Sequence, residues 1–283
     1  MMGTGSGKIS SGSIRFSRST VDPLSTRYDN SGDGLFHFDS GFAWLFDLGL
    51  KLVIWGIPVL FAVTFHELAH GIVADYLGDP TPRMMGRLSA NPLVHVDPFG
   101  TVLLPLILLL SHTGLMFGYA KPIPINMRNL HHYRRDSVLV AFAGPGSNLM
   151  MALISMSILH AFLSTLPLTA TSPLWGELLP IFLAMMKASI TVNIVLFFFN
   201  MIPLPPLDGG RVATGLLPDV IAEPLSRVEP YGIWIIFGLV ILDPYLGILS
   251  RTLWPLVETT TSSIITLAYD PSALFHLGGA NPE

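Results

Sequence analysis

The segment His66-Glu67-Leu68-Ala69-His70 has the residue types and the spacing of a catalytic metal site. Two histidines four residues apart on a helix lie on one face, so both imidazoles can bind the same metal ion. In zinc hydrolases of this design, the metal lowers the pKa of a bound water toward ~7, and the glutamate takes its proton and returns it to the leaving amine. The segment therefore predicts His66 and His70 as zinc ligands and Glu67 as the catalytic base and acid.

Asp208 is the best candidate for the third protein ligand that a catalytic zinc site needs beside an open position for water. It follows an apolar segment, within NMIPLPPLDGGR, where three prolines end the helix and two glycines permit a tight turn. Such a helix end leaves backbone groups unpaired at membrane depth, which is tolerable only inside protein or beside water. From the residues alone, a helix stop followed by an exposed loop explains this segment equally well.

The composition indicates the environment in which this site must work. The chain of 283 residues is 51% hydrophobic and only 12% charged, against about 25% charged in an average soluble domain. Its net charge of -4, without a block of basic residues, excludes nucleic acid as the obvious partner. The absence of cysteine excludes thiolate zinc ligands and cysteine nucleophiles. We therefore expect an all-α membrane protein, surrounded by the lipid bilayer, that holds its metal with histidine and carboxylate.

A helix needs ~20 apolar residues to cross the hydrocarbon core of a bilayer, and about five apolar segments are long enough. Together they predict a polytopic bundle of transmembrane helices. The second is the weakest, because its apolar run stops at a Ser-His-Thr-Gly stretch, and a re-entrant hairpin is the alternative to a full crossing. We expect the last segment to break at Asp243-Pro244. The segments are residues 50–77, 101–119, 138–162, 178–202 and 231–254.

The segments divide the chain into four predicted regions. Residues 1–40 are rich in Ser and Gly and contain no apolar run, so we expect a disordered tail. Residues 41–215 form the predicted intramembrane core, because they contain both parts of the candidate metal site. Residues 216–258 hold a loop and the final transmembrane segment, and residues 259–283 are expected to be a C-terminal tail.

These motifs resemble the site-2 protease family (peptidase family M50) of zinc intramembrane proteases. That family pairs an HExxH helix with a later Asn-x-x-Pro…Leu-Asp-Gly motif, and Asn200, Pro203 and Leu207 through Gly209 match it. The AGPGSN segment at 143–148 is similar to a further family segment. Residues 78–82 and 118–126 resemble the minimal, rhomboid-like prokaryotic branch without a PDZ domain. The resemblance covers about residues 50 to 215.

The resemblance implies a zinc-dependent endopeptidase that cleaves transmembrane protein substrates, with one Zn²⁺ per chain held by His66, His70 and Asp208. Glu67 would be the catalytic residue. Asn148 would be a polar group near the active site that contacts the substrate backbone or the oxyanion. Asn193 and Asn200 are further candidates for this contact, and each could instead serve helix packing. The implied location is a multi-pass position in a prokaryotic cell membrane, with the oligomeric state open.

Two features of the sequence leave alternatives open. With five full spans, most Lys and Arg residues would lie on the same side of the membrane as the N-terminus, which favours a cytoplasmic N-terminus. The same arrangement would make the HExxH helix antiparallel to the helix before Asp208. The family has these two helices parallel, so we prefer a re-entrant second segment. A metal transporter, a non-catalytic family member and a protease of the CAAX-processing kind are the competing functions. The last would use a glutamate as third ligand: Glu177, Glu223 or Glu229.

Overall fold

The computed structural model describes residues 43–98, 100, 121–165 and 173–270. The chain divides into two compact units, residues 1–47 and 48–283, and the second contains almost everything described below. The predicted tail of residues 1–40 and the weak second apolar segment at 101–119 lie outside the described residues. Of the predicted C-terminal tail, the structure describes residues up to 270.

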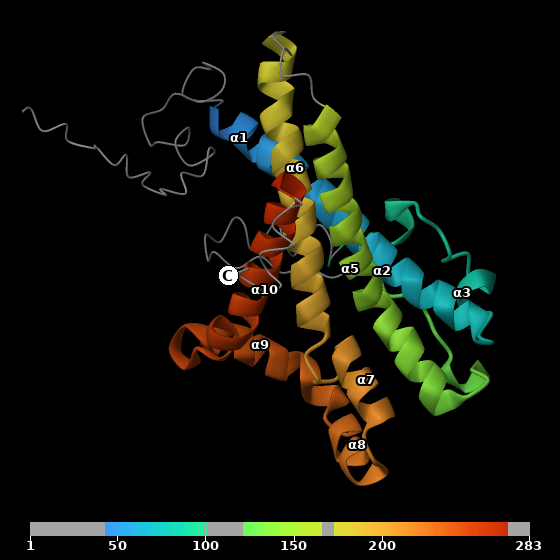
Figure 1. The fold of residues 1–283 in the computed structure, drawn as a ribbon. Coiled ribbons are helices and arrows are strands. Elements are labelled where there is room, and N and C mark those ends of the chain that lie inside the picture. Colours follow the sequence, from blue (N-terminus) through green and yellow to red (C-terminus); the bar gives the residue numbers. More distant parts are fainter. Residues whose placement is uncertain (1–42, 99, 101–120, 166–172, 271–283) are drawn as a thin grey trace, which may run out of the picture. The chain divides into compact units, whose positions relative to one another are not determined.

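The described residues form helices and contain no strand, which confirms the all-α prediction (Figure 1). Four helical runs are long and apolar enough to cross a membrane: Phe46–Tyr76, Tyr133–Thr165, Leu178–Asn200 and Glu229–Leu246. The membrane helix bundle is thereby confirmed. The α-helices are α1 Ala43–Lys51, α2 Ile57–Tyr76, α3 Thr81–Met84, α5 Tyr133–Thr165, α6 Pro173–Asn200, α7 Asp208–Leu216, α8 Asp219–Ser226, α9 Glu229–Leu246 and α10 Ile248–Tyr269. A π-helical turn, η1 Leu52–Gly56, joins α1 to α2, and two short 3₁₀ turns are η2 Pro92–Val94 and η4 Met127–Asn129.

The 33-residue helix α5 is the centre of the bundle, because α2, α6, α7 and α10 all pack against it. Its small side chains allow the neighbouring helices to approach closely, as is usual between helices in a membrane. The main apolar core lies between α5, α6 and α10. Its fully buried members are Ala152, Leu159, Ile190, Ile194 and Ala268.

Two backbone hydrogen bonds show to which end of the bundle the chain returns between α2 and α5. His131 N–H donates to Leu77 O, just after α2, at 3.0 Å, and Lys121 N–H donates to His95 O, also at 3.0 Å. Whatever path the intervening residues take, the chain is therefore back at the C-terminal end of α2 when α5 begins. We call this end of the bundle the loop end. Helices α2 and α6 end there, and helix α5 begins there. Helices α2 and α6 consequently run parallel, and the arrangement with five full spans is wrong.

The last apolar segment differs from the expected single span with a break at Asp243-Pro244. It forms two helices, α9 and α10, separated at Gly247, whose φ of +64° is a left-handed conformation that favours glycine. Pro244 lies inside α9, and the Asp243 carboxylate accepts hydrogen bonds from the N–H groups of Leu249 and Ser250 at 2.6 and 3.0 Å. That carboxylate thus satisfies two free donors at the start of α10.

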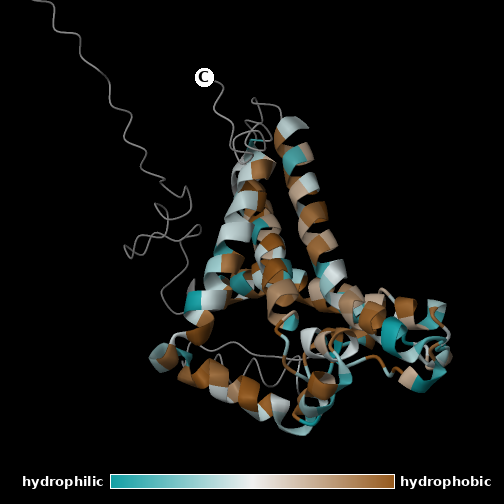
Figure 2. Ribbon diagram, turned by 60° about the horizontal axis from the view of Figure 1, so that its bottom comes forward, coloured by the Kyte–Doolittle hydropathy of each residue, from teal (hydrophilic) through white to brown (hydrophobic). Residues whose placement is uncertain are grey.

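Helix α10, not α9, is the one that packs lengthwise on the bundle. It lies against α5 and α6 and runs to Tyr269, so that the first residues of the expected tail are helical. Helix α9 runs across the loop end, and most of its own residues are apolar (Figure 2). A hydropathy pattern depends on composition and does not indicate the direction of a helix. The sequence therefore predicted one segment where the structure has two helices.

Asp79 connects the segment that follows α2 to the segment that precedes α5, and it is fully buried. Its carboxylate accepts hydrogen bonds from Thr81 Oγ1 at 2.5 Å, from the Asn126 N–H at 2.7 Å and from Asn129 Nδ2 at 2.8 Å. Burial raises the pKa of Asp79, but the bonds from Thr81, Asn129 and Asn126 outweigh burial and hold the pKa below its ordinary 3.8. The charged carboxylate therefore stabilises the fold.

Asp79→Ala should lower the free energy of unfolding by roughly 2–4 kcal/mol at neutral pH, because four part-buried donors, including the Thr81 N–H, lose their acceptor. A lowered pKa contributes stability above the ordinary pKa, and that contribution is lost as the pH falls through the folded-state value. The difference in Tm between wild type and variant should therefore shrink below about pH 4. Thermal unfolding in detergent measures it, with Thr81→Val as a control that removes one donor. Equal Tm values at pH 7 would contradict the role of Asp79.

Candidate metal centre

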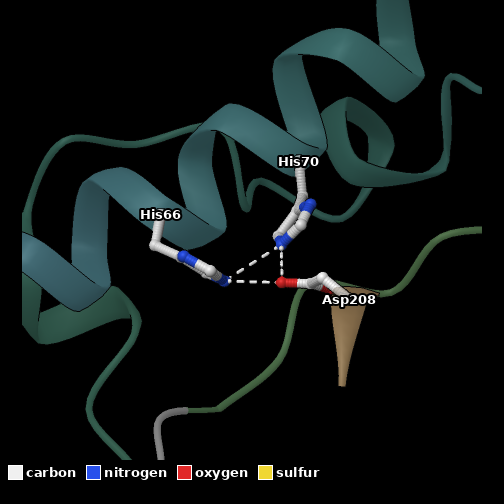
Figure 3. A group of neighbouring side chains, drawn as sticks. All are labelled: His66, His70 and Asp208. Atoms are coloured by element: carbon white, nitrogen blue, oxygen red, sulfur yellow. Dashed lines mark hydrogen bonds and ion pairs between the residues drawn. The ribbon is translucent and has the colours of Figure 1, made fainter. Parts of the chain in front are cut away.

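The structure brings His66, His70 and Asp208 together at one point (Figure 3). Both histidines come from α2, and Asp208 is the first residue of α7. The two Nε2 atoms are 3.1 Å apart, and Asp208 Oδ2 is 3.1 Å from His66 Nε2 and 3.3 Å from His70 Nε2. In the part of the chain that the structure describes, no other three His or acidic side chains form such a group.

The outer nitrogen of each ring is occupied by a bond that points away from this centre. His70 Nδ1 lies 2.7 Å from Val140 O, a backbone carbonyl that can only accept a hydrogen bond. His66 Nδ1 lies 2.6 Å from Asn148 Oδ1. A neutral imidazole that donates through Nδ1 keeps a lone pair on Nε2. Two nitrogen lone pairs and one carboxylate oxygen then face one another, which is the donor set of a catalytic zinc site and is repulsive without a cation.

The centre lies well inside two of the helices that are long and apolar enough to cross a membrane. His66 is ten residues before the end of α2 at Tyr76, which corresponds to roughly 15 Å along a helix. Gly144, which contacts the centre from α5, is eleven residues after Tyr133, or about 16 Å from the same end. His66 and His70 are also buried. Both distances are about half of the ~30 Å thickness of a hydrocarbon core.

Gly144 provides a smooth wall on the α5 side of the centre. A Cβ atom at this position would lie 2.6 Å from His70 Cε1 and 2.7 Å from His66 Cε1, and closer still to His70 Nε2. Only a residue without a side chain lets α5 approach the two imidazoles this closely. No role for Gly144 was predicted from the sequence, although it is the glycine of the AGP motif at 143–145, and that motif was the signal that could have found it.

Asp208 is held in place by the packing of the loop that precedes it. Gly209 and Gly210 lie in the first turn of α7. A Cβ on Gly209 would lie 2.6 Å from Ile202 O, and one on Gly210 would lie 2.6 Å from Pro205 Cδ. These glycines allow the loop to lie directly on α7, instead of forming the tight turn that the sequence suggested.

The far end of α7 is fixed to the start of α5. The Arg134 guanidinium donates to Gly215 O at 2.9 Å and to Leu217 O, and it pairs with Asp219 at 3.0 Å. The nine-residue helix α7 is thus anchored at both of its ends. Asp208 therefore points toward α2 from a rigid element.

Glu67 lies between the two histidines on α2 and is partly buried. Its Oε2 accepts a hydrogen bond of 2.9 Å from the backbone N–H of Ile123. Ile123 is buried and stands between two prolines in the segment that returns to the loop end before α5. The carboxylate is therefore oriented by a fixed backbone donor.

The three asparagines that the sequence singled out have different surroundings. Asn148 and Asn193 are fully buried and bonded to each other, with Asn148 Nδ2 2.9 Å from Asn193 Oδ1. Asn200 donates to Leu196 O, one turn earlier in α6, at 3.0 Å. Both polar atoms of Asn148 and both of Asn193 are used inside the protein, so their geometry does not favour contact with a substrate.

The glutamates of the CAAX-type alternative lie elsewhere. Glu223 is exposed and pairs with Arg227 at 2.7 Å, and Glu229 is exposed and pairs with Arg211 at 3.4 Å. Neither belongs to the group formed by the two histidines. The side chain of Glu177 is outside the described residues.

Comparisons with known proteins indicate the family to which the chain belongs. Residues 55–242 match the model of the family described as Peptidase family M50. The chain is 40% identical over 214 residues to "Putative zinc metalloprotease YwhC" of Bacillus subtilis (strain 168), covering 75% of the chain and 89% of that relative. It is 27% identical over 184 residues to "Putative zinc metalloprotease Rip2" of Mycolicibacterium smegmatis, covering 64% of each protein. No solved structure matched the chain.

Proposed function

Because the chain belongs to peptidase family M50, the site-2 protease family, we propose that it cleaves peptide bonds within or beside the transmembrane segments of other membrane proteins. The chain is a zinc metalloprotease, and Zn²⁺ is its cofactor. The observation that carries the proposal is the convergence of two imidazoles and one carboxylate at roughly 15 Å from the end of α2. A metal centre at this depth acts on bonds that water-soluble proteases do not reach.

We assign His66, His70 and Asp208 as the residues that hold the ion. When bound, zinc supplies a Lewis acid that polarises the scissile carbonyl and makes water nucleophilic at neutral pH. Asp208 provides one negative charge, and the two histidines act as neutral ligands. The two Nδ1 bonds, to Asn148 and Val140, orient the rings so that both Nε2 atoms face the centre.

We assign Glu67 the proton transfers. Its carboxylate takes a proton from the attacking water as the new C–O bond forms, and gives the proton to the nitrogen as the C–N bond breaks. The bond from Ile123 N–H to Oε2 fixes the carboxylate without using its second oxygen. The products are one free carboxyl group and one free amine.

The substrate segment must unwind locally before it can be cut. A helical amide is enclosed in its own hydrogen-bond ladder and cannot reach the metal in attack geometry. Helix-breaking residues near the cut should therefore favour cleavage. The location that fits this substrate class is a multi-pass position in a bacterial cell membrane, since both relatives are bacterial.

Zinc content tests the assignment without a known substrate. Purified protein should hold one zinc per chain, and His66→Ala and Asp208→Ala should each weaken zinc binding at least ~100-fold, because two protein ligands cannot complete the site. Atomic absorption and competition with a chelator measure this. Glu223→Ala and Glu229→Ala are matched controls that should keep zinc. Zinc loss in a glutamate variant instead of Asp208→Ala would support the CAAX-type site.

Two further outcomes concern the competing functions. Movement of zinc into sealed vesicles that contain the protein, unaffected by Glu67→Gln, would favour a metal transporter. A wild type that binds no metal after reconstitution would favour a non-catalytic family member.

A further inference from the structure

We propose that Asn148 and Asn193 form a positioning relay that fixes the orientation and the tautomer of His66. The inference rests on the zinc site proposed above and deepens it. The relay crosses three helices, because Asn193 belongs to α6, Asn148 to α5 and His66 to α2.

The relay is a continuous chain of short hydrogen bonds. Asn193 Nδ2 lies 2.9 Å from Ser189 O, and Asn193 Oδ1 lies 2.9 Å from Asn148 Nδ2. Asn148 Nδ2 also donates to Ala62 O at 3.1 Å, and Asn148 Oδ1 lies 2.6 Å from His66 Nδ1. Both asparagines have 0% exposure, so no water competes for these bonds.

The direction of each bond follows from two backbone carbonyls. Ser189 O can only accept, so the amide nitrogen of Asn193 must face it and the amide oxygen must face Asn148. That oxygen, together with Ala62 O, requires the amide nitrogen of Asn148 on the same side. The oxygen of Asn148 then faces His66, and Nδ1 of His66 must carry the proton.

The consequence for the metal centre is a lone pair on His66 Nε2, the atom that faces Asp208 at 3.1 Å. His70 obtains the same result from Val140 O, a backbone group that needs no particular side chain. Of the two histidines, only His66 depends on side chains for its tautomer. Hydrogen-bonding partners of metal-bound histidines typically contribute 10- to 100-fold to metal affinity.

Helix packing alone does not require this arrangement. Buried amides in a membrane-spanning region are costly unless they are fully bonded, and apolar side chains pack helices without that cost. A second polar pair between the same two helices, Ser155 and Ser189 at 2.8 Å, holds α5 to α6 without reaching a histidine. This pair provides a comparison for a purely structural contact.

The test compares zinc affinities of purified, metal-free proteins reloaded with zinc in competition with a chelator. Asn148→Leu has a similar size and removes the acceptor, and it should weaken zinc binding 10- to 100-fold. Asn193→Leu leaves Asn148 in place but unfixed, and it should weaken zinc binding by a smaller factor, at least about threefold. The control variant Ser155→Ala, which removes the bond to Ser189 Oγ and leaves Ser189 unchanged, should keep wild-type affinity even if its Tm falls.

A second measurement separates ring orientation from general loosening. With Co²⁺ in place of zinc, the visible absorption spectrum reports the ligand geometry, and it should change in both asparagine variants but not in the serine control. If Asn148→Leu does not fold, Asn193→Leu decides. Wild-type zinc affinity and cobalt spectrum in a folded asparagine variant would overturn the relay, as would an equal loss in the serine control. A wild type that binds no metal would instead contradict the proposed zinc site.

Discussion

Glu67→Gln should abolish proteolysis while the protein keeps its fold and its zinc. Glutamine has no group that can take a proton from water at neutral pH, and general acid–base catalysis contributes about 10²- to 10⁴-fold to such reactions. The glutamine oxygen can still accept the hydrogen bond from Ile123 N–H that now ends on Oε2. The substitution therefore removes the chemistry and preserves the contact.

The measurement compares membranes of cells that express either form of the chain. Mass spectrometry of terminal peptides should find new ends inside transmembrane segments with the wild type and lose them with Glu67→Gln. Zinc content and Tm should match between the two. Glu67→Ala is a useful second variant, because it removes the acceptor for Ile123 as well and should also lower Tm. Undiminished cleavage by Glu67→Gln would refute the assigned role.

Gly144→Ala should remove zinc binding, although Gly144 itself is no ligand. Its new methyl group would lie 2.6 Å from His70 Cε1 and 2.7 Å from His66 Cε1, where carbon atoms need about 3.5 Å or more. The two imidazoles belong to one helix and cannot both move aside without leaving Asp208. We expect a loss of zinc affinity of at least ~100-fold, similar to that from removing a ligand.

Gly146→Ala is the matched control for this substitution. It lies on the same helix, and its added Cβ would meet Phe142 Cε1 at an ordinary 3.4 Å. Both changes favour a helix by up to about 1 kcal/mol, so helix propensity does not distinguish them. Chelator competition should show wild-type zinc affinity for Gly146→Ala and at least ~100-fold weaker zinc binding for Gly144→Ala. Equal affinities would mean that α5 does not enclose the centre as closely as its backbone indicates.

Of the proposed zinc ligands, the two histidines were predictable because their spacing is local: two histidines on one turn of a helix need no knowledge of tertiary structure. The residues around Asp208 fitted an exposed loop equally well, and the family resemblance was what favoured it as the third ligand. The positions that orient them were not predictable in the same way. Asn148 and Gly144 act through contacts with α2, which lies more than seventy residues earlier in the chain. Their residue types alone are equally compatible with helix packing.

The direction of each helix was the least predictable feature. Length and composition identified four apolar helices correctly, but they did not indicate that α9 lies across the loop end and that the chain turns at Gly247 into α10. The parallel direction of α2 and α6 follows from contacts between residues on either side of an apolar stretch, such as the bonds from His131 to Leu77 and from Lys121 to His95. Hydropathy contains no information on which distant residues are joined by hydrogen bonds.

The depth of the centre also sets how a cut substrate leaves the bilayer. A bond cleaved roughly 15 Å from the loop end leaves about five residues on that side if the substrate is extended, or about ten if it is helical. Either stub is much shorter than the ~20 apolar residues that hold a protein in a membrane. If the proposed cleavage takes place at this depth, the fragment on the loop side keeps too few apolar residues to stay anchored in the bilayer. The position of His66 along α2 would therefore set the length of apolar sequence that the released fragment carries.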